Sequence, residues 1–296
     1  MSKEAGIKPP ARFTLVPTQT RNTLESYSLN STPTLNDMLF STRCTNKLTL
    51  ILLLAASVWQ TAQANDRPLL RATTSEDAYP YNFQFKKKID GLVYEIAKLL
   101  ATRSGYELRA EAQPWTRALQ TAKDTPNTLV FSVARNTERE QAYHWIGPVT
   151  TSEVWLFKLK SRTDIRLDTF EDLKPYTVGD VASSSTTNLL QKHGIKVDSA
   201  PSNVSNCRKF KAGRVDLIPF DPNGIKIFLH TCGLKPEDVE RSLHLPRDTA
   251  LYIALSKNSD PELVQQLQTQ FQAIVKDKSL QRLHEQWKMP YKAPSI

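Results

Sequence analysis

Two arginines lie four positions apart, directly after an apolar stretch that predicts a strand. The stretch covers residues 129–133, and Arg135 and Arg139 follow it. The planar guanidinium of arginine can bind a carboxylate through two parallel hydrogen bonds. The same side chains could instead form surface ion pairs. Two arginines at the end of one strand favour a site for a carboxylate.

A second polar cluster precedes a helix expected over 186–193, which Gly194 closes. It consists of Ser183, Ser184 and Ser185. Hydroxyl groups and unpaired amides at a helix N-terminus suit an anion. The serines would also serve as ordinary helix caps, and both roles can hold at once.

A carboxylate and three aromatic side chains complete the set of candidate site residues. Asp221 ends a strand expected over 215–220, where it could accept a hydrogen bond from an ammonium group. Trp115, Tyr79 and Tyr81 could form the walls of a pocket or belong to the core. Together these residues describe a clamp for a zwitterion.

Sequence signatures of catalysis are missing from the chain. It has no GxSxG, HExxH, P-loop or GxGxxG motif. No two histidines have the spacing of metal ligands; they are His144, His193, His230, His244 and His284. We therefore expect no metal, no cofactor and no catalytic residue.

The elements that must position these residues alternate between strands and helices. Strands are expected at 69–74, 106–112, 129–133, 154–158, 176–181, 215–220 and 251–255. Helices are expected after Gly91 and at 115–123, 186–193, 204–212 and 280–287, with a short one opened by a capping box at Asp168 and Glu171. A long helix is expected from Pro261, with apolar residues on one face as far as Val275. This alternation predicts an α/β fold with largely parallel sheets, whose ligands lie at the C-terminal ends of strands.

Composition sets the broad class. The chain has 296 residues, 40% apolar and 23% charged, which excludes collagen-like, low-complexity and fully disordered proteins. Its 39 basic and 30 acidic residues give a formal charge of +9. That charge would suit nucleic acid, but no basic and aromatic module accompanies it, so nucleic-acid binding is not expected.

The N-terminal segment has the parts of a secretory signal peptide. Arg43 and Lys47 precede an apolar run at 48–58, which is about half the length of a membrane span, and Ala62-Gln-Ala64 follows it. We expect cleavage after Ala64; a buried core helix is the alternative. Because the apolar run begins late, we further expect translation to start at Met38, with 1–37 a non-native or disordered extension and 38–64 the signal peptide.

The expected mature chain, 65–296, has 232 residues. Cleavage removes six basic and three acidic residues and leaves a charge of +6. We expect a periplasmic product. Cys207 and Cys232 remain in it, and they could either form a disulfide or stay as two buried thiols.

The order and spacing of several short motifs resemble the extracellular solute-binding proteins of family 3, the periplasmic polar amino-acid-binding proteins of ABC transporters. The motifs are Tyr79-Pro-Tyr81, Gly91-Leu-Val-Tyr-Glu-Ile96, Pro114-Trp115, Asn136-Thr-Glu-Arg139, Val178-Gly-Asp-Val-Ala-Ser-Ser-Ser185 and Gly213-Arg-Val-Asp-Leu-Ile-Pro-Phe-Asp221. Val93 departs from the family, which has an acid there, and Arg135 stands where a small apolar residue is usual.

The resemblance implies a role for each site residue. Arg139 would bind the α-carboxylate of the ligand, with Ser184 and Ser185 as further donors. Asp221 would bind the α-ammonium group, and Trp115 would stack on the ligand. Ser132 and Ala134 would line the end of the strand. Arg135 would either favour a more anionic ligand or pair internally with Glu138 or Glu76.

The resemblance also implies a periplasmic-binding-protein-like fold of two α/β lobes with a ligand cleft and two hinge crossovers. The crossovers would lie near 151–153 and 247–250, so that lobe I is 65–152 plus 250–296 and lobe II is 153–249. The implied function is capture of a small polar ligand, an amino acid or related carboxylate, by a monomer that delivers it to an ABC permease or a membrane sensor. The alternative is an enzyme of the same fold, similar to cyclohexadienyl or arogenate dehydratase, whose general acid would be Glu76, Glu153 or His144.

Overall fold

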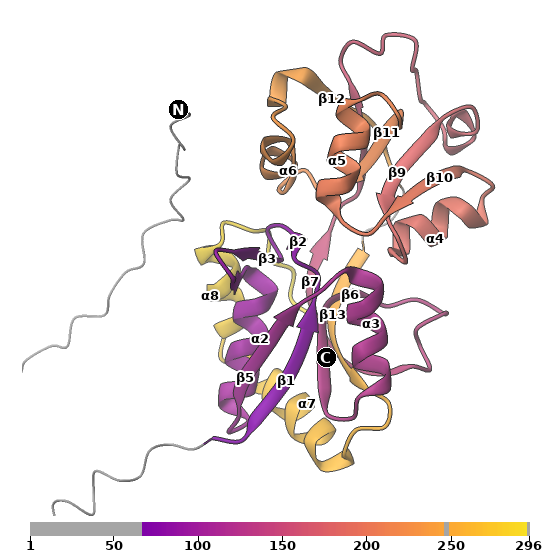
Figure 1. Cartoon of the computed structure of the whole chain (residues 1–296). Helices are drawn as coiled ribbons and strands as arrows, with labels where there is room; N and C mark the ends of the chain where they lie inside the picture. Colours follow the sequence, from indigo (N-terminus) through magenta and orange to yellow (C-terminus); the bar gives the residue numbers. More distant parts are fainter. Residues whose placement is uncertain (1–66, 246–248, 295–296) are drawn as a thin grey trace, which may run out of the picture. The chain divides into compact units, whose positions relative to one another are not determined.

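The computed structural model describes residues 67–245 and 249–294 (Figure 1). Asn65–Ile296 form one compact unit. The expected leader, its start at Met38 and its cleavage after Ala64 lie outside the described residues. Among the helices that are described, none has both the length and the apolar character needed to cross a membrane.

The first five-stranded sheet has the order β5-β1-β6-β13-β7. Its strands are β1 (Leu69–Thr74), β5 (Glu107–Ala112), β6 (Thr128–Ala134), β7 (Tyr143–Ser152) and β13 (Thr249–Ser256). β1, β5 and β6 are parallel, whereas β13 runs antiparallel to both β6 and β7. The sheet thus brings the end of β6, where the predicted site begins, beside the late strand β13.

Helices cover both faces of this sheet. They are α2 (Leu92–Arg103), α3 (Trp115–Asp124), α7 (Pro261–Lys276) and α8 (Ser279–Gln286). The buried side chains of α2, α7 and α8 share one core with the sheet, while α3 packs in a separate cluster with Val130 and Val133 of β6. As expected, Asp260 caps α7 by accepting from the amide of Glu262 at 2.9 Å, with Pro261 in the first position.

The second five-stranded sheet has the order β10-β9-β11-β8-β12. Its strands are β8 (Trp155–Leu159), β9 (Thr177–Val181), β10 (Lys196–Ala200), β11 (Leu217–Phe220) and β12 (Val239–His244). Its helices are α4 (Ser185–Lys192), α5 (Asn203–Lys211) and α6 (Ile225–Thr231), with the short 3-10 helices η1 (Phe170–Leu173) and η2 (Pro236–Asp238). Leu156 and Phe157 of β8 belong to separate cores on opposite faces of this sheet.

A disulfide joins Cys207 of α5 to Cys232, the C-cap residue that follows α6. It lies beside the core that contains Phe210 and Phe228. The bond therefore ties together the two helices that pack on one face of the second sheet.

Both sheets are mixed, which corrects the expectation of largely parallel sheets. In the second sheet β10, β9 and β11 are parallel, but β8 is antiparallel to β11 and to β12. The antiparallel strands are those through which the chain passes from one sheet to the other, so no helix needs to bring it back to the same edge. β7 was not expected because Gly147-Pro148 interrupts its pattern.

Three smaller differences concern local structure. A hairpin of β2 (Asp77–Ala78), β3 (Asn82–Phe85) and β4 (Lys88–Asp90) was not expected, nor were β10, β12 and α6. The capping box of η1 is formed by Thr169 and Asp172, one residue later than Asp168 and Glu171. We use lobe I for the described residues up to Ser152 and from Thr249 onward, and lobe II for those from Glu153 to Leu245, because β7 and β13 belong to the first sheet and β8 begins at Trp155 in the second.

Candidate functional site

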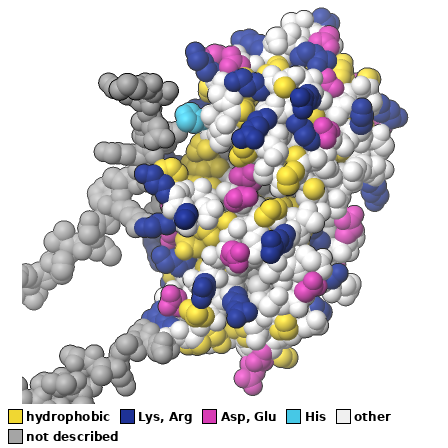
Figure 2. All heavy atoms as spheres, in the orientation of Figure 1, with side chains coloured by type: hydrophobic (Ala, Val, Ile, Leu, Met, Phe, Trp, Pro, Cys, Tyr) yellow, Lys and Arg dark blue, Asp and Glu magenta, His cyan; other side chains and the backbone are white. Residues whose placement is uncertain are grey.

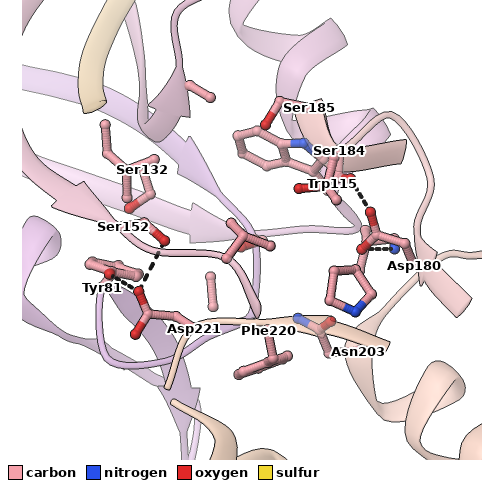
Figure 3. A pocket seen from close by; sticks show the side chains of 18 of the residues that line it. Tyr81, Trp115, Ser132, Ser152, Asp180, Ser184, Ser185, Asn203, Phe220 and Asp221 are labelled. Atoms are coloured by element: carbon pink, nitrogen blue, oxygen red, sulfur yellow. Dashed lines mark hydrogen bonds between the residues drawn. The ribbon is translucent and has the colours of Figure 1, made fainter. Parts of the chain in front are cut away.

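A cavity of about 200 Å³ is lined by residues of both lobes (Figure 3). Most of the predicted site residues line it: Tyr79, Trp115, Ser132, Arg139, Ser184, Ser185 and Asp221. Ala134 and Tyr81 line it as well. The structure thus brings together predicted site residues that are up to 142 positions apart in the chain, as between Tyr79 and Asp221.

Arg139 contributes a buried guanidinium to the wall from the turn after β6. The side chain is 8% exposed. It donates to the carbonyl of Ala134 at 3.1 Å and, across the lobes, to the carbonyl of Ser183 at 2.6 Å. Its guanidinium lies 5.9 Å from the ring centroid of Trp115, within the range of a cation–π contact. This arrangement fixes a positive charge where an anionic ligand group can approach.

Ser184 caps α4, as one of the two roles expected for the serine cluster. Its hydroxyl accepts from the amide of Thr187 at 2.8 Å and donates to Asp180. A serine hydroxyl has one hydrogen, so the donor that was expected for a ligand carboxylate is directed at Asp180 instead. Ser185 begins α4 at the wall of the pocket, where the positive end of the helix favours negative charge.

Asp180 is a buried acid that sequence analysis did not select. It lines the pocket, and it accepts from the amide of Val181 at 2.7 Å and the hydroxyl of Thr187 at 2.9 Å in addition to Ser184. Burial, which outweighs these hydrogen bonds, raises the pKa of its carboxyl above the ordinary value. Its hydrogen bonds to Val181, Ser184 and Thr187 position the turn that leads into α4.

Asp221, directly after β11, contributes a carboxylate to the wall of the pocket. It is 8% exposed and accepts four hydrogen bonds. Its Oδ1 accepts from the amide and the side-chain nitrogen of Asn223 at 2.8 and 2.9 Å. Its Oδ2 accepts from the hydroxyls of Tyr81 and Ser152 at 2.5 and 3.0 Å, as Figure 3 shows.

Tyr81 reaches Asp221 from lobe I because its backbone is held at the start of α2. The amide of Val93 donates to the Tyr81 carbonyl at 2.8 Å. Gly91 precedes α2 with φ of 129°, and a Cβ there would lie 2.5 Å from the same carbonyl oxygen, so the close approach requires glycine. Burial first, and then the charge of Asp221, raise the pKa of Tyr81 well above its ordinary value. The hydroxyl therefore keeps its proton and acts as a donor.

An acid of lobe I, Asp77, also contacts lobe II. Asp77 in β2 accepts from the amide of Asn203, the first residue of α5, at 2.6 Å, and from the Asn203 side chain at 3.3 Å. Burial raises the pKa of Asp77 above its ordinary value. Both residues line the pocket, so this contact closes another part of its wall.

Ser132 carries an unpaired hydroxyl at the pocket. It is the extra residue of a bulge in β6, since Phe131 pairs with Ile253 and Val133 with Tyr252. Its φ is 64°, and its buried Oγ has no hydrogen-bond partner in the part of the chain that the structure describes. A ligand hydroxyl or carboxylate would satisfy it.

Arg135 does not line the pocket. It forms an ion pair with Glu140, with Nε to Oε2 at 2.8 Å and Nη2 to Oε1 at 2.5 Å, and lies over the rings of Trp145 and Tyr252. Internal pairing was one of the expected alternatives, but the partner is Glu140 rather than Glu138 or Glu76.

The three residues considered for a general acid also lie outside the pocket lining: Glu76, Glu153 and His144. Glu153 accepts from the indole of Trp155 at 3.3 Å. His144 contacts the carbonyl of Lys257 at 3.1 Å on the exposed surface. Among the described residues, no group of His, Cys, Asp and Glu could hold a metal ion.

Two α/β lobes with a polar pocket between them define the class of periplasmic-binding-protein-like folds. A model of the bacterial extracellular solute-binding proteins, family 3, matches residues 70–290, and the chain belongs to this family. It is 22% identical over 211 residues to the L-cystine-binding protein TcyA of Bacillus subtilis (strain 168), which covers 71% of this chain and 77% of that protein.

Solved structures share the fold. An ancestral arginine-binding protein bound to arginine is similar with a TM-score of 0.65 at 19% identity, over 75% of this chain and 98% of that one. A histidine kinase sensor domain with similarity to periplasmic binding proteins is similar with a TM-score of 0.68 at 15% identity, over 75% of this chain and 97% of that one.

Proposed function

We propose that this protein is a periplasmic solute-binding protein that captures a small polar ligand, an amino acid or related carboxylate, for an ABC-type importer. The observation that carries the proposal is the buried guanidinium of Arg139 in a pocket built from both lobes. A buried cation in a pocket favours an anionic group of the ligand, since each neutralises the other away from water.

The size of the cavity supports a small ligand. Its volume of about 200 Å³ is below the ~300–1,000 Å³ of pockets for drug-sized molecules. Lobe I contributes Arg139 and Trp115, and lobe II contributes Ser185 and Asp221. A ligand that touches both lobes stabilises their closed arrangement, which is how such proteins couple binding to recognition by a membrane partner.

The relatives support the ligand class. One binds cystine and another was solved with arginine, and both of these ligands carry carboxylate groups. The similar sensor domain leaves a membrane sensor as an alternative partner to an ABC permease. An enzyme is not favoured, because Glu76, Glu153 and His144 lie outside the lining of the pocket.

Charge on the face seen in Figure 2 does not favour nucleic acid. On the face in Figure 2, Lys and Arg side chains are spread out and interspersed with Asp and Glu. A nucleic-acid site would gather basic side chains along one face or stripe.

A matched pair of arginine variants tests the proposal. The protein, produced from the full chain, is screened by thermal shift against amino acids and small carboxylates. A ligand at 100 times its Kd stabilises the folded state by ~2.7 kcal/mol. Arg139→Ala is expected to weaken binding of every hit at least tenfold, whereas Arg135→Ala, which lies outside the pocket, is expected to bind as the wild type does. Equal binding by both variants contradicts the proposal.

A further inference from the structure

The carboxylate of Asp221 has no acceptor position left for a ligand. An ionised carboxylate has about four lone-pair sites on its two oxygens. Asn223 supplies two donors to Oδ1, and Tyr81 and Ser152 supply one each to Oδ2. An ammonium group could bind Asp221 only by displacing one of these four donors.

The donors differ in how easily they can be displaced. Asn223 lies two residues beyond Asp221 and donates from its own backbone as well as its side chain, so its contacts are local. The hydroxyls of Tyr81 and Ser152 come from lobe I. At 2.5 Å, the bond from Tyr81 is the shortest of the four. A ligand ammonium must therefore compete with Tyr81 or with the weaker donor Ser152.

Tyr81 has a second acceptor within reach. Its hydroxyl oxygen lies 3.2 Å from the carbonyl of Thr151, whereas it lies 2.5 Å from Asp221. Its one hydrogen goes to the nearer, charged acceptor, since a hydrogen bond to a carboxylate is stronger than one to a neutral carbonyl. The side chain is 5% exposed, so leaving Asp221 would exchange a charged partner for a neutral one in a dry environment.

We propose that Tyr81 is a specificity-determining residue: its hydroxyl holds the position on Asp221 that a ligand ammonium would take, so the pocket prefers small carboxylates that lack an ammonium group beside the carboxylate. This inference rests on the proposed function, because it names the ligand class of the same pocket. The carboxylate of such a ligand would still bind Arg139.

The hydroxyl of Ser132 gives the pocket a neutral polar partner for the ligand. Its Oγ lines the pocket with no partner among the described residues, and a hydroxyl both donates and accepts. It can satisfy a ligand hydroxyl or keto oxygen without any charge on the ligand. Because the acceptor positions of Asp221 are filled, a 2-hydroxy acid fits the polar groups of this pocket better than the 2-amino acid of the same shape.

Pairs of ligands that differ in this one group test the inference. The probes are L-glutamate with 2-hydroxyglutarate, L-phenylalanine with 3-phenyllactate, and L-arginine with its 2-hydroxy analogue. Kd is measured by calorimetry for the wild type, Tyr81→Phe and Tyr143→Phe. Tyr143 is the matched control, because its buried hydroxyl donates to the carbonyl of Leu119 at 2.8 Å and does not line the pocket.

For any of these pairs of probes with a measurable Kd, the wild type is expected to bind the hydroxy acid at least tenfold more tightly than the amino acid. Tyr81→Phe frees one position on Asp221, so the ratio of the two Kd values is expected to shift at least tenfold toward the amino acid. Tyr143→Phe is expected to leave the ratio unchanged. The wild-type ratio alone remains informative if Tyr81→Phe does not fold.

A wild type that prefers the amino acid, with a ratio that Tyr81→Phe does not change, overturns the inference and leaves the proposed function intact. A ratio that shifts equally in both tyrosine variants also overturns it, because a general loss of packing would then be the cause. Absence of binding by every member of both series, in the wild type as in Arg139→Ala, contradicts the proposed function and this inference with it.

Discussion

Two carboxylates join the lobes of this protein, and they accept from different kinds of donor. Asp77 of lobe I accepts from the backbone amide of Asn203 at the start of α5. Asp221 of lobe II accepts from the hydroxyl of Tyr81. A backbone amide in the first turn of a helix cannot turn away, whereas a hydroxyl can reorient. The comparison teaches that Asp77 suits a fixed latch between the lobes, whereas Asp221 is a contact for which a ligand ammonium must compete.

The largest effect is expected for Asp221→Ala. Its removal takes the charged acceptor away from four donors, among them the buried Tyr81 hydroxyl, and a hydrogen bond to a charged group contributes about 1.5–3 kcal/mol. We expect the free energy of unfolding to fall by about 2–4 kcal/mol, measured by urea denaturation. Asp164→Ala is the control, because Asp164 is exposed and pairs with Arg162 at the surface. Equal stability of the two variants would show that Asp221 is not held as described.

A smaller effect is expected for Asp77→Ala, because opening of the lobes lets water reach the amide of Asn203. Loss of a side-chain acceptor at a helix start costs about 0.5–2 kcal/mol. Small-angle X-ray scattering of the ligand-free protein should also give a larger radius of gyration for this variant than for the wild type. An unchanged radius together with unchanged stability would remove Asp77 as a latch.

Sequence reasoning found the site residues whose signal is local. Arg139 and Asp221 follow strands, and Trp115 begins a helix, so strand and helix ends were enough to select them. Asp77 was missed because its partner Asn203 is 126 positions away. No local pattern reports a contact between residues that only the assembled fold brings together.

The two arginines show a second limit. Both follow β6, yet Arg139 turns into the pocket and Arg135 pairs with Glu140 over two aromatic rings. The alternation of a strand assigns faces within β6, but it stops where the strand ends at Ala134. The bulge at Ser132 is likewise set by pairing with β13, which is more than 100 positions away. These features depend on tertiary structure, and the sequence of β6 alone does not encode them.

The pH dependence of stability tests whether folding favours the neutral form of Asp77. Burial raises the pKa of Asp77 in the folded protein, so folding favours its neutral form. Its contribution to stability is fully present below the ordinary aspartate pKa near 3.9 and is lost as the pH rises through the raised value. The free energy of unfolding of the wild type relative to Asp77→Asn should therefore decrease from acid toward neutral pH. Asp180, whose pKa is also raised, is present in both proteins and cancels from the difference. A difference that grows toward neutral pH would contradict the burial of Asp77.

The smallest effect is expected for Ser152→Ala, which removes the weaker of the two hydroxyl donors on Oδ2. The Ser152 bond to Asp221 is 3.0 Å long, and the same hydroxyl has the carbonyl of Glu153 as a second acceptor at 3.4 Å. A single hydrogen bond of this kind contributes about 0.5–1.5 kcal/mol, so we expect a loss of stability of about 1 kcal/mol or less. The ratio of Kd values for amino and hydroxy acids should shift in the same direction as in Tyr81→Phe, but by less. If Ser152→Ala shifted the ratio more than Tyr81→Phe does, Ser152 rather than Tyr81 would be the hydroxyl that competes with a ligand ammonium, and specificity would be decided at the end of β7 rather than at the residue before β3.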